Sequence, residues 1–122
     1  MRFRLCLVLF ATSLCSASAQ KLVHLSCDVP AQADTPGYHL DFTLNESAHT
    51  VSFFVDAFNT MNVAQASFTE SYVTWSQELA GIRNRRSINR STLEFIDTEE
   101  EAQGMRSYRG TCKLADPPPK QF

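Results

Sequence analysis

The sequence predicts an all-β domain, a single antiparallel meander of about eight strands that closes into a barrel. Apolar residues alternate with polar ones in short segments, and no segment after the first nineteen residues keeps a helical period over three turns. Two cysteines, Cys27 and Cys112, stand near opposite ends of the same part of the chain. A bond between them would place the first and last strands side by side, which favours a closed barrel over the alternative, a β-sandwich.

Residues 1–19 have the features of a secretory signal peptide. Arg2 and Arg4 precede an apolar run from Leu5 to Leu14, and the small residues 17–19 form a signal-peptidase pattern. A run of about ten apolar residues is too short to serve as a transmembrane anchor. We therefore expect removal of residues 1–19 and a monomeric product that is exported, either periplasmic or secreted.

The rest of the chain divides into a β domain, residues 20–115, and a Pro-rich tail, residues 116–122, that cannot join a sheet. The full chain has 11 Lys and Arg against 13 Asp and Glu, a net charge of −2. Loss of Arg2 and Arg4 lowers this charge by two, to −4. A weakly acidic surface argues against a nucleic-acid partner, because such partners are held through their phosphates.

Cys27 and Cys112 are the only cysteines left once Cys6 and Cys15 depart with the signal. In an exported protein such a pair predicts a disulfide. The bond would close a loop of about 85 residues and stabilise the domain by about 4 to 5 kcal/mol in the chain-entropy model. Neither cysteine belongs to a CxxC motif or a histidine-rich cluster, so we predict no redox or metal role for them.

The alternation places strands at residues 21–29, 38–44, 51–55, 63–68, 72–77, 82–89, 93–97 and 106–114. Residues 31–37 form a turn-rich connection, and residues 56–62 form an irregular loop. In the hairpin formed by 38–44 and 51–55, both apolar sets share a face only if partner numbers sum to an odd value. Leu40 with Phe53 and Phe42 with Val51 are such pairs, whereas a slip of one residue would expose a whole set.

Residues 87–95, SINRSTLEF, predict the corner of another hairpin. The apolar alternation breaks at residues 89–92, where Asn, Ser and Thr side chains are able to bond nearby backbone groups. Asn45 and Asn89 each begin a glycosylation acceptor pattern, Asn-x-Ser. We interpret both asparagines as turn residues.

Basic residues before this corner face acidic residues after it in the predicted hairpin. The basic set is Arg83, Arg85, Arg86 and Arg90, and the acidic set is Glu94, Asp97, Glu99, Glu100 and Glu101. Cross-strand ion pairs account for the arginines without a ligand. The alternative is an anion-binding patch, since Arg83 and Arg85 share a strand face. The candidate ligand or anion contacts are therefore Arg83, Arg85, Arg90 and Trp75, although Trp75 also suits the core.

Catalytic and metal-binding patterns are missing from the sequence. It has no GxSxG, HExxH, P-loop or Rossmann glycine pattern. His39 and Asp41 share a strand face but offer two metal ligands, fewer than the three or four protein ligands of zinc sites. His49 falls on the other face, so it should not converge with His39. The acidic residues 99–101 suit a solvated loop, and Tyr38, Tyr72 and Tyr108 are candidates for lining a barrel mouth. We predict no catalytic residue, no metal site and no cofactor.

Three segments of the second half form a distinctive set, namely Val73-Thr74-Trp75, residues 88–95 and residues 108–113, together with the Pro-rich end at Phe122. The set resembles a group of small exported bacterial proteins of uncharacterised function, with an Ile-Asp/Asn-Arg-x-Thr-Gly hairpin and a terminal Gly-x-Cys-Lys strand. The resemblance covers roughly the last 50 residues and departs at Leu93, where the pattern has Gly. It implies a bacterial, periplasmic origin and a β fold, and it implies no activity.

A second, weaker resemblance is to the periplasmic inhibitors of C-type lysozymes, which are small disulfide-linked β-barrels. Their inhibitory Ser-Gly-x-x-Tyr loop is not found in this sequence. Lysozyme inhibition therefore serves only as an example of a binding role.

Together these observations favour a non-enzymatic exported domain that binds a protein, an envelope component or a small apolar ligand through its loops or a barrel mouth. One alternative is a small periplasmic hydrolase or metal-dependent enzyme that uses His39, Asp41 or the acidic run 99–101. A second alternative is a structural or stress-protective envelope protein.

Overall fold

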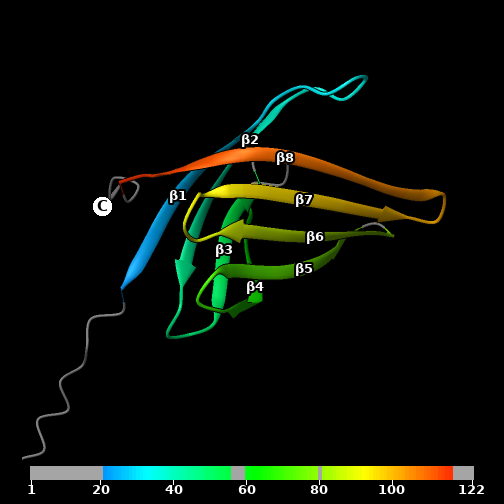
Figure 1. Ribbon diagram of the computed structural model, residues 1–122. Helices are drawn as coiled ribbons and strands as arrows, with labels where there is room; N and C mark the ends of the chain where they lie inside the picture. Colours follow the sequence, from blue (N-terminus) through cyan, green and yellow to red (C-terminus); the bar gives the residue numbers. More distant parts are fainter. Residues whose placement is uncertain (1–20, 56–59, 80, 117–122) are drawn as a thin grey trace, which may run out of the picture.

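A computed structural model describes residues 21–55, 60–79 and 81–116 and shows eight antiparallel strands closed into a barrel (Figure 1). Each strand pairs with its neighbours in the chain, and the last strand returns to the first. The predicted fold class is confirmed. The strands are β1 (Leu22–Val29), β2 (Tyr38–Asn45), β3 (Thr50–Val55), β4 (Thr60–Phe68), β5 (Tyr72–Leu79), β6 (Ile82–Asn89), β7 (Glu94–Glu101) and β8 (Gly104–Leu114).

The barrel consists of two four-stranded halves, and Figure 1 shows β5 to β8 crossing β1 to β4 at a steep inclination. The seams between the halves are short. Only residues 66–68 of β4 pair with residues 73–75 of β5, and only residues 25–28 of β1 pair with residues 111–114 of β8. By contrast, β5 and β6 pair along their whole length. Few ladder hydrogen bonds therefore close the barrel at the two places where the halves meet.

The predicted disulfide joins the strands of the β1–β8 seam. Cys27 lies directly opposite Cys112, with the two Cα atoms 4.0 Å apart and the sulfurs bonded. The strands cross closely here, because a Cβ on Gly110 would clash with the carbonyl oxygen of Asp28 and lie 2.8 Å from a methyl carbon of Val29. The absence of a side chain at Gly110 thus allows β8 to pass over β1.

The register of the β2–β3 hairpin corrects one prediction. Its partner numbers do sum to an odd value, so both apolar sets face inward as expected, but Phe42 pairs with Phe53 and Leu44 with Val51. The predicted pairs, Leu40 with Phe53 and Phe42 with Val51, are wrong by two residues. The cause is the turn at residues 46–49, which ends with His49 at a φ of 54° and makes Asn45 the partner of Thr50.

Two predicted loops are also partly wrong. Residues 60–62 belong to β4 because they pair with β3, while residues 56–59 lie outside the described residues. The acidic run 99–101 is strand rather than loop, because it pairs with residues 104–106 of β8. The predicted signal, residues 1–19, and residues 117–122 of the predicted tail also lie outside the described residues.

The core fills the barrel with inward-facing side chains from all eight strands. Phe42 lies at its centre, and its ring is 5.1 Å from Trp75, 5.5 Å from Phe95 and 6.0 Å from Phe53 between centroids. Trp75 is therefore a core residue, as its strand pattern allowed. The buried apolar set is Leu25, Cys27, Val29, Phe42, Leu44, Val51, Phe53, Ala64, Val73, Trp75, Ile88, Phe95 and Tyr108.

The predicted hairpin corner is confirmed at the β6–β7 turn. The side-chain oxygen of Asn89 accepts hydrogen bonds from the backbone N–H groups of Ser91 at 2.9 Å and Thr92 at 3.1 Å. Asn45 has the corresponding role at the β2–β3 turn, where its side-chain oxygen accepts from the backbone N–H of Ala48. Leu93 has a φ of 61°, the left-handed conformation that favours glycine. The hairpin pattern of the small exported bacterial proteins has Gly at the position of Leu93, and Gly readily adopts this backbone conformation.

Candidate ligand-binding site

An apolar cavity of about 660 Å³ opens at one end of the barrel. At this end β1, β3, β5 and β7 begin and the other four strands finish, so we name it the Arg90 end. Volumes of this size accommodate small organic ligands. The apolar lining consists of Val23, Leu25, Leu44, Phe68, Val73, Ile88, Leu93 and Leu114.

The cavity is a funnel whose floor is the barrel core. Leu25, Val73 and Ile88 are nearly inaccessible to solvent and form part of both the core and the cavity lining. Nearer the rim, Phe68 is partly buried and Leu114 is 71% exposed. Because side chains alternate along each strand, the inward positions continue to the strand ends and leave an apolar wall.

Arg90 ties three turns together at the rim of the funnel. Its guanidinium donates to both carboxylate oxygens of Glu46, from Nη1 at 3.1 Å and from Nη2 at 3.0 Å. Nη1 also donates to the carbonyl oxygen of Thr69 at 2.6 Å. The backbone N–H of Arg90 donates to the carbonyl oxygen of Ser71 at 2.8 Å. These bonds connect the β2–β3, β4–β5 and β6–β7 turns and fix the shape of the mouth. The hydrogen bond from Arg90 is the main cause that lowers the pKa of Glu46.

The opposite end, which we name the Tyr38 end, has a polar interior. Asp97 is almost fully buried on β7, and its Oδ2 accepts a hydrogen bond from the Tyr38 hydroxyl at 2.8 Å. Nε of Arg86 lies 3.5 Å from the same oxygen, and its guanidinium lies 5.4 Å from the centre of the Phe53 ring. Burial, followed by the charge of Asp97, raises the pKa of Tyr38 well above its usual range. Tyr38 therefore remains a neutral hydrogen-bond donor.

Several buried polar atoms beside this pair have no hydrogen-bond partner in the part of the chain that the structure describes. They are Trp75 Nε1, Gln77 Oε1, Asn84 Oδ1, Nε and Nη1 of Arg86, and Oδ1 of Asp97. Their residues are cross-strand neighbours, since Trp75 pairs with Arg86, Gln77 with Asn84, and Arg86 with Asp97. Burying polar groups without partners costs stability. The barrel interior thus changes from apolar at the Arg90 end to polar at the Tyr38 end.

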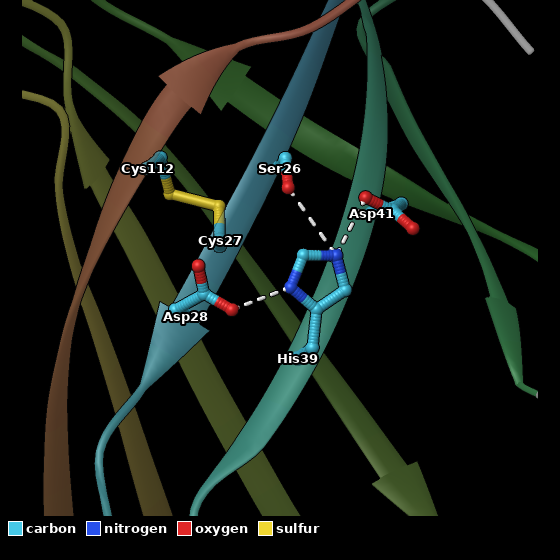
Figure 2. Close-up of polar contacts among 6 residues, drawn as sticks. All are labelled: Ser26, Cys27, Asp28, His39, Asp41 and Cys112. Atoms are coloured by element: carbon cyan, nitrogen blue, oxygen red, sulfur yellow. Dashed lines mark hydrogen bonds and ion pairs between the residues drawn. A yellow bond between two sulfur atoms is a disulfide. The ribbon is translucent and has the colours of Figure 1, made fainter.

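A third cluster lies on the outer face of β1 and β2, beside the disulfide (Figure 2). Nδ1 of His39 is 2.6 Å from Oδ1 of Asp28, and Nε2 is 2.9 Å from Oδ1 of Asp41. The hydroxyl of Ser26 is 3.3 Å from the same Nε2. Ser26, His39 and Asp28 have the composition of a hydrolytic triad.

The electrostatics of this cluster do not suit hydrolysis. The Asp28 and Asp41 carboxylates raise the pKa of His39, which favours the protonated ring, and a protonated ring has no lone pair to act as a base. Nε2 is closer to Asp41 than to Ser26, and the side chains of His39 and Asp28 are 46% and 68% exposed. The surface groove beside the cluster is lined by His39 and Asp28 but not by Ser26.

The cluster also does not suit a metal ion. The two carboxylates lie at different ring nitrogens, so they do not converge on one coordination site (Figure 2). Within residues 21–55, 60–79 and 81–116, no group of three or more His, Cys, Asp or Glu side chains is placed to hold a metal ion.

The described residues also contain no apolar helix of the length needed to cross a bilayer.

We expect NMR titration to give His39 a pKa above the ordinary value of about 6.5. Asp28→Asn should lower this pKa, because the Asp28 hydrogen bond is the first cause of the shift. Since the pKa is raised in the folded state, the stabilising contribution is complete below pH 6.5 and is lost as the pH rises through the folded-state pKa. Asp34→Asn in the exposed β1–β2 connection is the control and should leave the His39 titration unchanged. An ordinary pKa for His39 in the wild-type protein would contradict the hydrogen bonds of its ring to Asp28 and Asp41.

The predicted anion contacts lie in two places. Arg83, Arg85 and Trp75 line an outer groove of about 510 Å³ across β4 to β7, together with several Ser and Thr residues, whereas Arg90 lies at the funnel rim. Cross-strand ion pairing is confirmed for Arg85 with Glu100 at 3.0 Å. The predicted pairing with an acid of β7 is wrong for Arg90, which pairs with Glu46 of the β2–β3 turn.

The three tyrosines also fail to line one mouth. The rings of Tyr38 and Tyr108 meet edge to face, 6.3 Å apart, whereas Tyr72 begins β5 at the Arg90 end. The sequence predicted loops or a barrel mouth as the binding region but did not identify the residues that line the funnel. A weak signal for it was present, because inward apolar positions continue to the very ends of the strands, as at Val23, Leu44 and Phe68.

Comparison of the chain with protein-family models, curated proteins and solved structures finds no significant match. The resemblance to small exported bacterial proteins therefore stays a prediction.

Proposed function

We propose that this protein is a non-enzymatic binding protein that takes up a small, largely apolar molecule in the funnel at the Arg90 end. The observation that carries the proposal is the cavity of about 660 Å³, lined by eight apolar residues and open at the rim. Sites for small organic molecules are typically concave, mostly apolar and edged by a few polar groups. The funnel has each of these features.

Two further observations support binding rather than catalysis. The cluster of Ser26, Asp28, His39 and Asp41 lies on the outer face of the barrel, and its two carboxylates favour a protonated His39. The funnel mouth is held in one shape by Arg90, and the core beneath it is closed by the disulfide between β1 and β8. A preformed site loses little conformational entropy when it binds its ligand. The disulfide is also consistent with an exported protein.

Phenylnaphthylamine, an uncharged probe that fluoresces in apolar surroundings, tests the proposal directly. We expect saturable fluorescence with the wild-type chain and its loss in Val23→Trp, since an indole at this cavity-lining position fills the funnel. Val63→Trp is the matched control, because Val63 is 64% exposed and does not line the funnel. Absence of saturable binding to the wild-type chain, or equal binding by both variants, would rule out the funnel as the site.

A further inference from the structure

The charges at the funnel rim are unequal. The charged residues of the lining are Lys21, Glu46 and Arg90, two cations and one anion. Glu46 and Arg90 are joined by two hydrogen bonds. Lys21 lies near enough for its charge to lower the pKa of Glu46, but it forms no ion pair within 4 Å among the described residues. The lining residues therefore have one positive charge in excess, on a chain whose formal net charge is −2.

The ion pair between Glu46 and Arg90 is too firmly held for Glu46 to bind a cationic ligand. Both carboxylate oxygens of Glu46 accept hydrogen bonds from Arg90, and the lowered pKa of Glu46 keeps it ionised. Arg90 is held in addition by the carbonyl oxygen of Thr69. A cationic ligand group would have to displace Arg90 from Glu46, whereas an anionic group meets two cations that line the cavity, Lys21 and Arg90. His49, whose ring packs against Phe68, and Lys21 are the further charged neighbours that lower the pKa of Glu46.

From this arrangement we infer that the ligand of the funnel is an anionic amphiphile, with an apolar chain inside the cavity and a carboxylate or phosphate group at Lys21 and Arg90. This inference rests on the proposed function, since it specifies the chemistry of the molecule that the funnel binds. The apolar wall provides affinity that does not depend on charge. Lys21 provides the preference for an anionic head, and that preference should weaken as salt concentration rises.

Three probes with the same apolar chain separate the two contributions: dodecanoate, dodecanol and dodecyltrimethylammonium, each used below its aggregation concentration. Displacement of phenylnaphthylamine from the full chain gives the dissociation constant of each probe. We expect dodecanoate to bind more tightly than dodecanol, and dodecyltrimethylammonium to bind least tightly. A monododecyl phosphate arm then distinguishes a phosphate head from a carboxylate head.

Substitution of Lys21 tests the residue assignment. Lys21→Ala should weaken dodecanoate binding by about two- to fivefold and Lys21→Glu by about tenfold, while dodecanol binding remains unchanged. Lys21 is exposed, so neither substitution should disturb the fold. Lys113→Glu is the matched control, since Lys113 is exposed near the end of β8 and does not line the funnel.

The outcomes separate the inference from the proposed function. Equal binding of all three probes, or unchanged dodecanoate binding by Lys21→Glu, would overturn the anionic head while leaving the apolar funnel in place. Loss of dodecanol binding in Lys21→Glu would also overturn it, because Lys21 would then act on the cavity rather than on the head group. Binding of none of the probes would overturn both proposals.

Discussion

Replacement of both disulfide cysteines, Cys27→Ser with Cys112→Ser, should lower the free energy of unfolding by about 4 to 5 kcal/mol. The bond joins residues separated by 85 positions, so its loss increases the conformational entropy of the unfolded chain and favours unfolding. The effect should be large relative to total stability, which for domains of this size is about 5 to 15 kcal/mol. The bond also crosses a seam where only four residues of β1 pair with β8.

Urea denaturation of the wild-type and double-variant proteins measures this change. Reduction of the wild-type protein should reproduce the effect of the two substitutions, and reductant should have no effect on the double variant. If the double variant kept the wild-type unfolding midpoint, the β1–β8 seam would be held by its packing and ladder bonds alone.

The second large effect concerns the buried ion pair at the Tyr38 end. Arg86→Met should destabilise the protein by about 3 to 5 kcal/mol, because the buried Asp97 carboxylate then keeps, among the described residues, the Tyr38 hydroxyl alone as partner. Adding Asp97→Leu should restore most of the loss, since the charge that lacked a partner is then gone. The two substitutions are therefore expected to be strongly non-additive.

A neighbouring ion pair gives the control for this double-mutant cycle. Arg85→Met removes the partner of Glu100 on the outer face, where the Arg85 side chain is 57% exposed, and should cost less than about 1 kcal/mol. Urea denaturation of the four cycle variants and of Arg85→Met measures all of these changes. Equal decreases in the free energy of unfolding for Arg85→Met and Arg86→Met would contradict strong coupling between Arg86 and Asp97. Additive decreases in the double-mutant cycle would contradict it as well.

The fold was predictable from the sequence because its signals are local or unambiguous. Alternation along residues such as Leu40, Phe42 and Leu44 identifies a strand and its buried face, and two remaining cysteines allow one pairing. The register of β2 with β3 was missed by two residues because it depends on the length of the turn before Thr50. Parity fixes which face is buried, whereas turn geometry fixes which residues are partners.

The candidate site was less predictable because it depends on contacts between distant turns. Arg90 pairs with Glu46, 44 positions away, and the two meet only when the barrel closes. Its local surroundings favoured a partner among the acids of β7. The funnel likewise exists only in the closed barrel, where the ends of different strands, such as those containing Val23 and Phe68, surround one cavity.

The most direct test of the central claim is methyl NMR of the full chain during titration with dodecanoate. We predict saturable shifts of the Val23, Leu44 and Ile88 methyl signals, which line the funnel, and no shift for Val63 on the outer face. Unchanged funnel methyl signals at saturating dodecanoate, or shifts confined to Val63 and its neighbours on the outer surface, would contradict the account.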